Sequence, residues 1–242
     1  MKFAFESHVG KVRQQNEDNG VVVALDEYQV LAIVADGMGG HQAGEVASSL
    51  AVEQISHFIK MHYFQPPHDM MKQGIMHANH AIYEKSRLEK PLLGMGTTVV
   101  LAWLGLDNIT IAHVGDSRAY HIFEGKIHRL TKDHSVVEGM VECGLLTPAQ
   151  AEVHPRKHEI TRALGTSLSI EPTFCTLENA KGTLLLCSDG LNNMLSDIEI
   201  LAIILKHDNI NEAATQLVQA ANDHGGVDNI TVALLELGEG LR

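Results

Sequence analysis

The stretch Val34-Ala35-Asp36-Gly37-Met38-Gly39-Gly40-His41 joins an apolar run to a glycine-rich turn, with a carboxylate between the two. The apolar run from Val30 to Ala35 is typical of a buried strand, and it stops at Asp36. The glycines that follow let the backbone turn and come close to whatever this carboxylate binds. The stretch therefore predicts a strand that delivers an acidic side chain to one end of a sheet.

The same pattern of apolar run and acid recurs along the chain. Asp116 follows residues 108–114, Asp189 follows residues 183–187, and Asp228 comes just before the apolar run 230–235. Each of these acids is expected at a strand end, where a sheet can gather residues that are distant in sequence. A lone Asp-Gly is more often a simple turn, so the prediction of a site rests on the whole set.

Carboxylates gathered at one point repel each other, by about 4 kcal/mol per pair at roughly 4 Å and an effective dielectric near 20. A divalent cation removes this cost. Ligation by oxygen alone suits Mg²⁺ or Mn²⁺ better than Zn²⁺, which prefers His and Cys. The acids therefore predict a magnesium or manganese centre.

Composition limits the class of protein. The 242 residues, 45% hydrophobic and 20% charged, suit one globular domain with a sizeable core. The net charge of -12 argues against a nucleic-acid partner, which would need a basic face. Three widely spaced cysteines, no signal-peptide pattern and no apolar run of about 20 residues favour a cytoplasmic protein without a membrane segment.

Hydrophobic periodicity predicts strands and helices in blocks. Strands are expected at 3–8, 21–25, 29–35, 97–104, 108–114, 118–123, 172–177, 183–187 and 229–237, with a polar stretch over 11–19. Helices are expected at 44–62, 68–88, 196–205 and 211–224, and short helices in 134–165. Capping boxes begin at Thr147 and Ser196. Because strands and helices do not alternate strictly, an α+β fold with mainly antiparallel sheets is favoured.

Eight short motifs along the chain together resemble one protein family. They are residues 10–18 (GKVRQQNED), 36–41 (DGMGGH), 94–98 (GMGTT), 115–120 (GDSRAY), 130–135 (LTKDHS), 160–165 (ITRALG), 188–190 (SDG) and 228–231 (DNIT). In this order they resemble the metal-dependent protein serine/threonine phosphatases, the protein phosphatase 2C family, in its bacterial form. The blocks cover almost the whole chain, and their combination is far more specific than any one of them.

The resemblance implies a four-layer αββα sandwich, with two central antiparallel sheets flanked by helix pairs. It implies one domain over 1–242, with a flap insertion over roughly 134–165. The implied reaction is hydrolysis of phosphoserine and phosphothreonine on proteins. Two Mn²⁺ or Mg²⁺ ions would activate a water that attacks phosphorus directly, and the family pattern also includes a third metal site. The implied partners are phosphorylated protein substrates and a cognate Ser/Thr kinase, and a monomer is expected.

The resemblance also assigns roles to single positions. Asp36 would bridge the two core ions, and the Gly37 carbonyl would bind the first. Asp189 and Asp228 would complete the second ion, and Asp116 with Asp189 would form a third site. Asp18 and Glu17 would act through bound waters. Arg13 matches the arginine that holds the substrate phosphate, a role suited to its bidentate guanidinium.

One position departs from the animal relatives, which place a histidine directly after the Asp-Gly to protonate the leaving alkoxide. Met38 stands there and cannot donate a proton. His41, three residues on, is the candidate general acid. The alternative is that His41 only orders the loop or contacts the substrate.

Two other readings of the sequence remain as alternatives. A non-catalytic phosphoprotein-binding module could use the same fold, although every matched acid is present. An esterase-like mechanism could use Ser117 of Gly115-Asp116-Ser117 as a nucleophile. That mechanism would leave Asp36, Asp189 and Asp228 unexplained.

Overall fold

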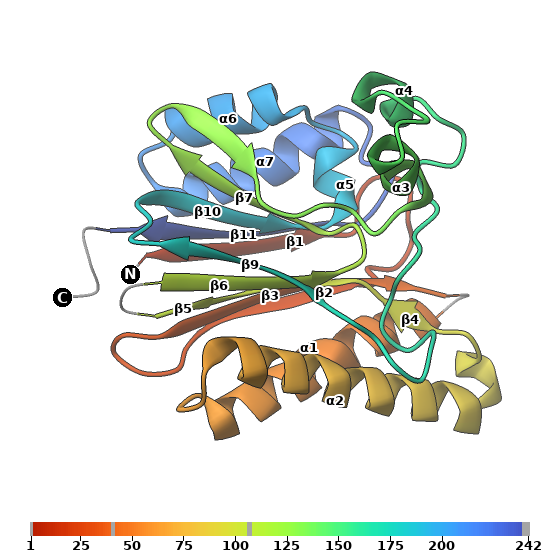
Figure 1. Cartoon of the computed structure of the whole chain (residues 1–242). Helices are drawn as coiled ribbons and strands as arrows, with labels where there is room; N and C mark the ends of the chain where they lie inside the picture. Colours follow the sequence, from red (N-terminus) through yellow and green to blue (C-terminus); the bar gives the residue numbers. More distant parts are fainter. Residues whose placement is uncertain (1, 40–41, 106–107, 239–242) are drawn as a thin grey trace.

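Two β-sheets face each other and helices cover their outer faces, as the computed structural model shows over residues 2–39, 42–105 and 108–238 (Figure 1). The order of layers is helices α1 and α2, one sheet, the second sheet, then helices α6 and α7. All pairings between neighbouring strands of the two sheets are antiparallel. This confirms the predicted αββα sandwich.

The first sheet has the order β2-β3-β5-β6-β9, with β4 paired to β3. Its strands are β2 (Asp18–Ala24), β3 (Val30–Met38), β4 (Gly96–Thr97), β5 (Val99–Leu104), β6 (Asn108–Val114) and β9 (Thr173–Glu178). Helices α1 (Ala43–His62) and α2 (Pro67–Leu88) lie across its outer face, and the 3-10 turn η1 (Lys90–Leu92) follows α2. Among the helices of the described residues, none is long and apolar enough to cross a membrane.

The second sheet has the order β1-β11-β10-β7-β8. Its strands are β1 (Phe3–His8), β7 (Arg118–Phe123), β8 (Lys126–Arg129), β10 (Gly182–Cys187) and β11 (Ile230–Leu237). Its helices are α5 (Asp189–Asn192), α6 (Asp197–Lys206) and α7 (Ile210–Asp223). The capping box predicted at Ser196 begins α6, and the one at Thr147 begins α4 (Pro148–Glu152) in the flap segment.

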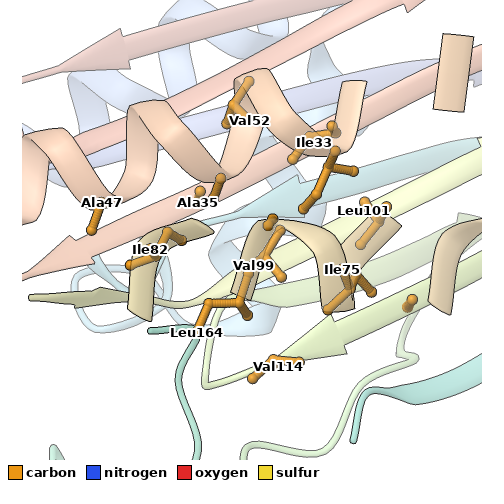
Figure 2. Packing of buried hydrophobic residues seen from close by; sticks show 14 of the residues in the cluster. Ile33, Ala35, Ala47, Val52, Ile75, Ile82, Val99, Leu101, Val114 and Leu164 are labelled. Carbon is orange, nitrogen blue, oxygen red and sulfur yellow. The ribbon is translucent and has the colours of Figure 1, made fainter. Parts of the chain in front are cut away.

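Three hydrophobic layers hold the sandwich together. One lies between α1, α2 and the first sheet, where Ile75 and Ile82 of α2 pack on sheet residues such as Leu101 (Figure 2). The second lies between the two sheets, and the third lies under α6 and α7. Because β3 is covered on both faces, residues Val30 to Ala35 are all buried. This explains why the central strand reads as a continuous apolar run.

Several strands differ from the predictions. Strand β2 begins at Asp18, inside the stretch 11–19 that was described only as polar, because its first residue pairs with β3. The predicted strand 97–104 is two strands, since Thr98 leaves the ladder and its N–H donates to the Asp36 carbonyl. Strand β8 was missed, because Lys126–Arg129 is a short exposed edge strand with little apolar patterning.

The flap segment contains two short helices, as predicted. Helix α3 (Val136–Glu142) is capped by the Ser135 hydroxyl, and α4 follows it. The two ends of the segment are joined, because Ser135 bridges Ile160 and the Thr161 N–H donates to the His134 carbonyl. Both helices lie at the end of the sandwich that also holds α5 (Figure 1).

Candidate metal centre

Strand register brings two of the predicted acids together. Asp18 on β2 is paired with Asp36 on β3, although 18 residues and a turn separate them. The Asp36 carbonyl accepts hydrogen bonds from Thr98 N–H and Thr97 Oγ1, both at 2.8 Å. The Asp36 N–H donates to Thr98 Oγ1 at 3.2 Å. The backbone at Asp36 is therefore fixed on both sides.

Gly37 allows a close approach of three segments. Its N–H donates to the Glu17 carbonyl at 3.1 Å, and a Cβ built on Gly37 would lie 2.1 Å from the Gly44 carbonyl oxygen. A Cβ on Gly44 would lie 2.8 Å from Glu17 Oε1. Because Gly37 and Gly44 have no side chains, the start of α1 and the Glu17 carboxylate can pack directly beside the Asp36–Gly37 backbone.

Asp189 approaches Asp36 from the second sheet. It is the first residue of α5, directly after Ser188, and the charge of its carboxylate acts on the carboxylate of Asp36. Asn193, one helical turn later, donates from Nδ2 to Asp189 Oδ2 at 3.0 Å. Asp116, in the turn between β6 and β7, lies within electrostatic range of Asp189. The acids from both sheets therefore converge.

Burial and mutual repulsion raise the pKa values of these acids. The pKa of Asp18 rises to about 7, mainly through burial and further through Asp189 and Asp228. The pKa of Asp116 also rises to about 7, through burial and then the charge of Asp189. The pKa of Asp36 lies well above its usual range because of burial and the charges of Asp18, Asp189, Asp116 and Asp228. Such a cluster costs stability unless positive charge offsets it.

The donor atoms fit a hard divalent cation. Asp18 Oδ1 and Asp189 Oδ1 are buried and have no hydrogen-bond partner, which is costly for carboxylate oxygens. An ion with oxygen ligands would satisfy both. Among the described residues, no group of three or more His, Cys, Asp or Glu side chains is already placed to hold a metal ion. Asp228 Oδ2 accepts a hydrogen bond from Arg13.

Arg13 lies beside the acids. Its Nη2 donates to Asp228 Oδ2 at 2.9 Å, and its side chain stays half exposed. Burial lowers the pKa of Arg13, but the charges of Asp228, Glu17 and Asp36 outweigh this and raise it. A cation that faces solvent beside a carboxylate cluster can bind a phosphate group at the edge of the cluster.

The structure thus brings together Asp36, Gly37, Asp189, Asp228, Asp116, Asp18, Glu17 and Arg13. The roles assigned to these residues stay predictions. His41 lies outside the described residues. Ser117 is only 1% exposed and shares a hydrogen bond of 2.7 Å with Thr98, so its hydroxyl is not placed as a nucleophile.

Sequence analysis missed two residues that hold the acids. The buried Ser188 accepts from Thr231 N–H at 3.0 Å and donates its own hydrogen to Asp18 Oδ2 at 2.7 Å. Asn193 holds Asp189 as described above. The spacing of Asp189 and Asn193, four residues apart in a helical turn, could have indicated their contact. Nothing in the sequence indicates the contact between Ser188 and Asp18.

The raised pKa values predict a pH-dependent stability of the protein kept in EDTA. Asp18 and Asp116 bind protons more tightly in the folded protein than in the unfolded chain, where their pKa is near 3.8. Between about pH 4 and pH 7 the folded state therefore holds more protons, and the free energy of unfolding falls as pH rises. Thermal unfolding at pH 5 and pH 8 should show Tm falling, by about 2–4 °C for each kcal/mol lost.

Asp18→Asn is the control for this pH effect, because it removes one of the titrating groups. Its Tm should fall less between pH 5 and pH 8 than that of the wild type. Saturating Mn²⁺ should also weaken the fall, because a cation binds the deprotonated carboxylates. A Tm that rises with pH in EDTA would contradict the repulsion inferred for the cluster.

Solved structures of known proteins share the fold of this sandwich. The crystal structure of the serine/threonine phosphatase Stp1 from Staphylococcus aureus is similar, with a TM-score of 0.93 at 34% identity, covering 98% of this chain and 95% of that one. The catalytic domain of the phosphatase PstP in complex with two manganese ions is similar at a TM-score of 0.85 and 34% identity, with 98% and 97% covered.

Sequence comparison gives the family. The serine/threonine phosphatase stp of Listeria monocytogenes is 39% identical over 241 residues, which is 98% of this chain and 96% of that protein. The family model of protein phosphatase 2C matches residues 7–231. The chain belongs to the protein phosphatase 2C family. This confirms the family resemblance and bears out the prediction of a phosphatase.

Proposed function

We propose that this protein is a metal-dependent phosphatase that hydrolyses phosphoserine and phosphothreonine on proteins. The observation that carries the proposal is the convergence of acids from both sheets, with two buried oxygens unpartnered and Arg13 at the edge. Membership of the phosphatase 2C family supports it. A non-catalytic binding module is not favoured, because such a module would not need this costly cluster of carboxylates.

Oxygen ligands would hold two core Mn²⁺ or Mg²⁺ ions. Asp36 would contact both ions, and the Gly37 carbonyl would bind the first. Asp189 and Asp228 would bind the second ion, while Asp18 and Glu17 would act through bound waters. Asp116 with Asp189 would provide a third site. When bound, the ions lower the pKa of a water molecule and offset the charge of the phosphate dianion.

Residues of the chain bind the substrate phosphate and supply a proton to the leaving group. Arg13 binds the phosphate oxygens of the substrate and sets their orientation beside the acids. Water attacks phosphorus and releases a proton to solvent, and the P–O bond to the serine or threonine oxygen breaks. His41 gives a proton to the leaving alkoxide and recovers one from solvent. No phosphoenzyme forms. Neither Ser117 nor Cys187 is suited to attack phosphorus, because Ser117 is buried and burial raises the pKa of the Cys187 thiol to about 12.

Hydrolysis of p-nitrophenyl phosphate and of a phosphothreonine peptide tests the proposal. We expect turnover with Mn²⁺, loss of turnover in EDTA and recovery when Mn²⁺ is restored. A chase with a phosphate-labelled substrate should leave no label on the protein. A folded protein that releases no phosphate with Mn²⁺ or Mg²⁺ would contradict the proposed activity. Covalent label during turnover would contradict direct attack by water.

We further propose the biological setting that the sequence suggests. Residues 1–242 form one phosphatase domain with a flap at roughly 134–165, and the protein acts as a monomer in the cytoplasm. It opposes a bacterial Ser/Thr kinase and binds neither nucleic acid nor membrane. The net charge of -12 supports the absence of a nucleic-acid partner. Size-exclusion chromatography with light scattering would test the oligomeric state.

A further inference from the structure

The segment that carries Arg13 has an irregular backbone. Residues 9–17, here called the arginine loop, connect β1 in one sheet to β2 in the other and contain no helix or strand. Backbone groups of such a loop lack the partners that a ladder provides. A substrate-binding side chain on this loop needs another device to fix its position.

Asn229, directly before β11, holds the loop in place. Its side chain is buried, with 5% exposure. Nδ2 donates to the Val9 carbonyl at 2.8 Å and to the Gln15 carbonyl at 2.9 Å. Oδ1 accepts from the Glu17 N–H at 2.8 Å. One amide therefore joins both ends of the arginine loop, with Arg13 between its contacts.

The backbone is closely packed where Gly10 meets Asp228. Gly10 has φ +83°, and a Cβ there would lie 2.2 Å from the Asp228 carbonyl oxygen. The Lys11 N–H donates to the Gly226 carbonyl at 2.7 Å. The Asn229 N–H donates to Asp228 Oδ1 at 2.9 Å, while Arg13 contacts Oδ2 of the same carboxylate. Asn229 thus fixes the loop and, through its backbone, the carboxylate that Arg13 contacts.

We propose that Asn229 is a positioning residue, whose side-chain amide clamps the arginine loop so that Arg13 is held ready for the substrate phosphate. The role of Arg13 rests on the proposed function, whereas the clamp is a property of the fold. An amide is required because the three partners are two acceptors and one donor. Aspartate has the same shape but offers only acceptors, so it would place negative charge against two carbonyl oxygens.

Hydrogen exchange tests the clamp without any catalysis. In EDTA, the Glu17 amide should exchange slowly in the wild type although it lies outside every helix and strand. In Asn229→Asp, exchange over 9–17 should accelerate about tenfold or more, because the two hydrogen bonds that Nδ2 donates to Val9 and Gln15 are lost. Asn229→Ser adds no charge and serves as the second variant if the aspartate fails to fold. Unchanged protection of the loop in a folded variant would overturn the proposal.

Kinetics test whether the clamp acts through Arg13. Asn229→Ser should lower kcat/KM for p-nitrophenyl phosphate about 10- to 100-fold, since small misplacements of a binding group have such effects. In an Arg13→Ala background the same substitution should cost less than about threefold, because the two residues act as one unit. A full, additive loss in that background would overturn positioning through Arg13.

Asn79 offers a matched control. It is 1% exposed, its Nδ2 donates to the carbonyls of Ser167 and Leu168, and its Oδ1 accepts from Gly165 N–H. Asn79→Asp and Asn79→Ser therefore make the same chemical change elsewhere. They should lower Tm but leave exchange over 9–17 unchanged. Faster loop exchange in these variants would show that general destabilisation explains the effect, and would overturn the clamp. A wild type without turnover would contradict only the proposed function.

Discussion

Asp36→Asn is expected to abolish metal-dependent turnover while raising the stability of the protein in EDTA. Asp36 is the acid on which the charges of Asp18, Asp189, Asp116 and Asp228 converge. An amide of the same shape removes one charge from this repulsive cluster, so Tm in EDTA should rise. If Asp36 bridges the two ions as proposed, its loss removes several kcal/mol of transition-state stabilisation, so kcat should fall by about 10³-fold or more.

The two readouts together separate a metal ligand from a structural acid. The wild type should gain Tm with added Mn²⁺, and the Asp36→Asn substitution should remove most of that gain. Glu27→Gln is the control, because Glu27 is exposed in the turn between β2 and β3. It should leave both Tm and turnover unchanged. Retained turnover in Asp36→Asn, or a lower Tm in EDTA, would contradict the assigned role.

Arg13→Ala is expected to reduce kcat/KM by roughly 10- to 100-fold, mainly through a higher KM. The guanidinium is half exposed beside the acids, and charged hydrogen bonds are worth about 1.5–3 kcal/mol. Inhibition by inorganic phosphate should weaken in parallel, because product and substrate share the phosphate group. Steady-state kinetics with p-nitrophenyl phosphate at saturating Mn²⁺ would measure both effects.

Arg13→Lys distinguishes geometry from charge. Lysine keeps the positive charge but lacks the planar pair of donors, so it should recover only part of the lost kcat/KM. The Mn²⁺ concentration for half-maximal activity should change less than about threefold in Arg13→Ala if the residue binds phosphate alone. A collapse of Mn²⁺ affinity would instead show that Arg13 serves to organise Asp228.

The fold could be predicted to a large extent from local patterns. The apolar run 30–35 indicates a strand covered on both faces, and the capping box at Ser196 gives the start of α6. Strand β8 could not be predicted in this way, because a four-residue edge strand is stabilised by pairing with β7 and not by its own composition.

Local patterns predict which residues carry the chemistry, because acids next to apolar runs mark strand ends, and motifs in the family's order mark the class. How these residues meet depends on the packing of the two sheets. The register of β2 against β3 places Asp18 opposite Asp36, and α5, which follows β10 of the other sheet, adds Asp189 as its first residue. The contacts of Ser188 with Asp18 and of Asn229 with the arginine loop join residues 170 or more positions apart. No local pattern encodes such contacts, since they arise when two sheets pack face to face.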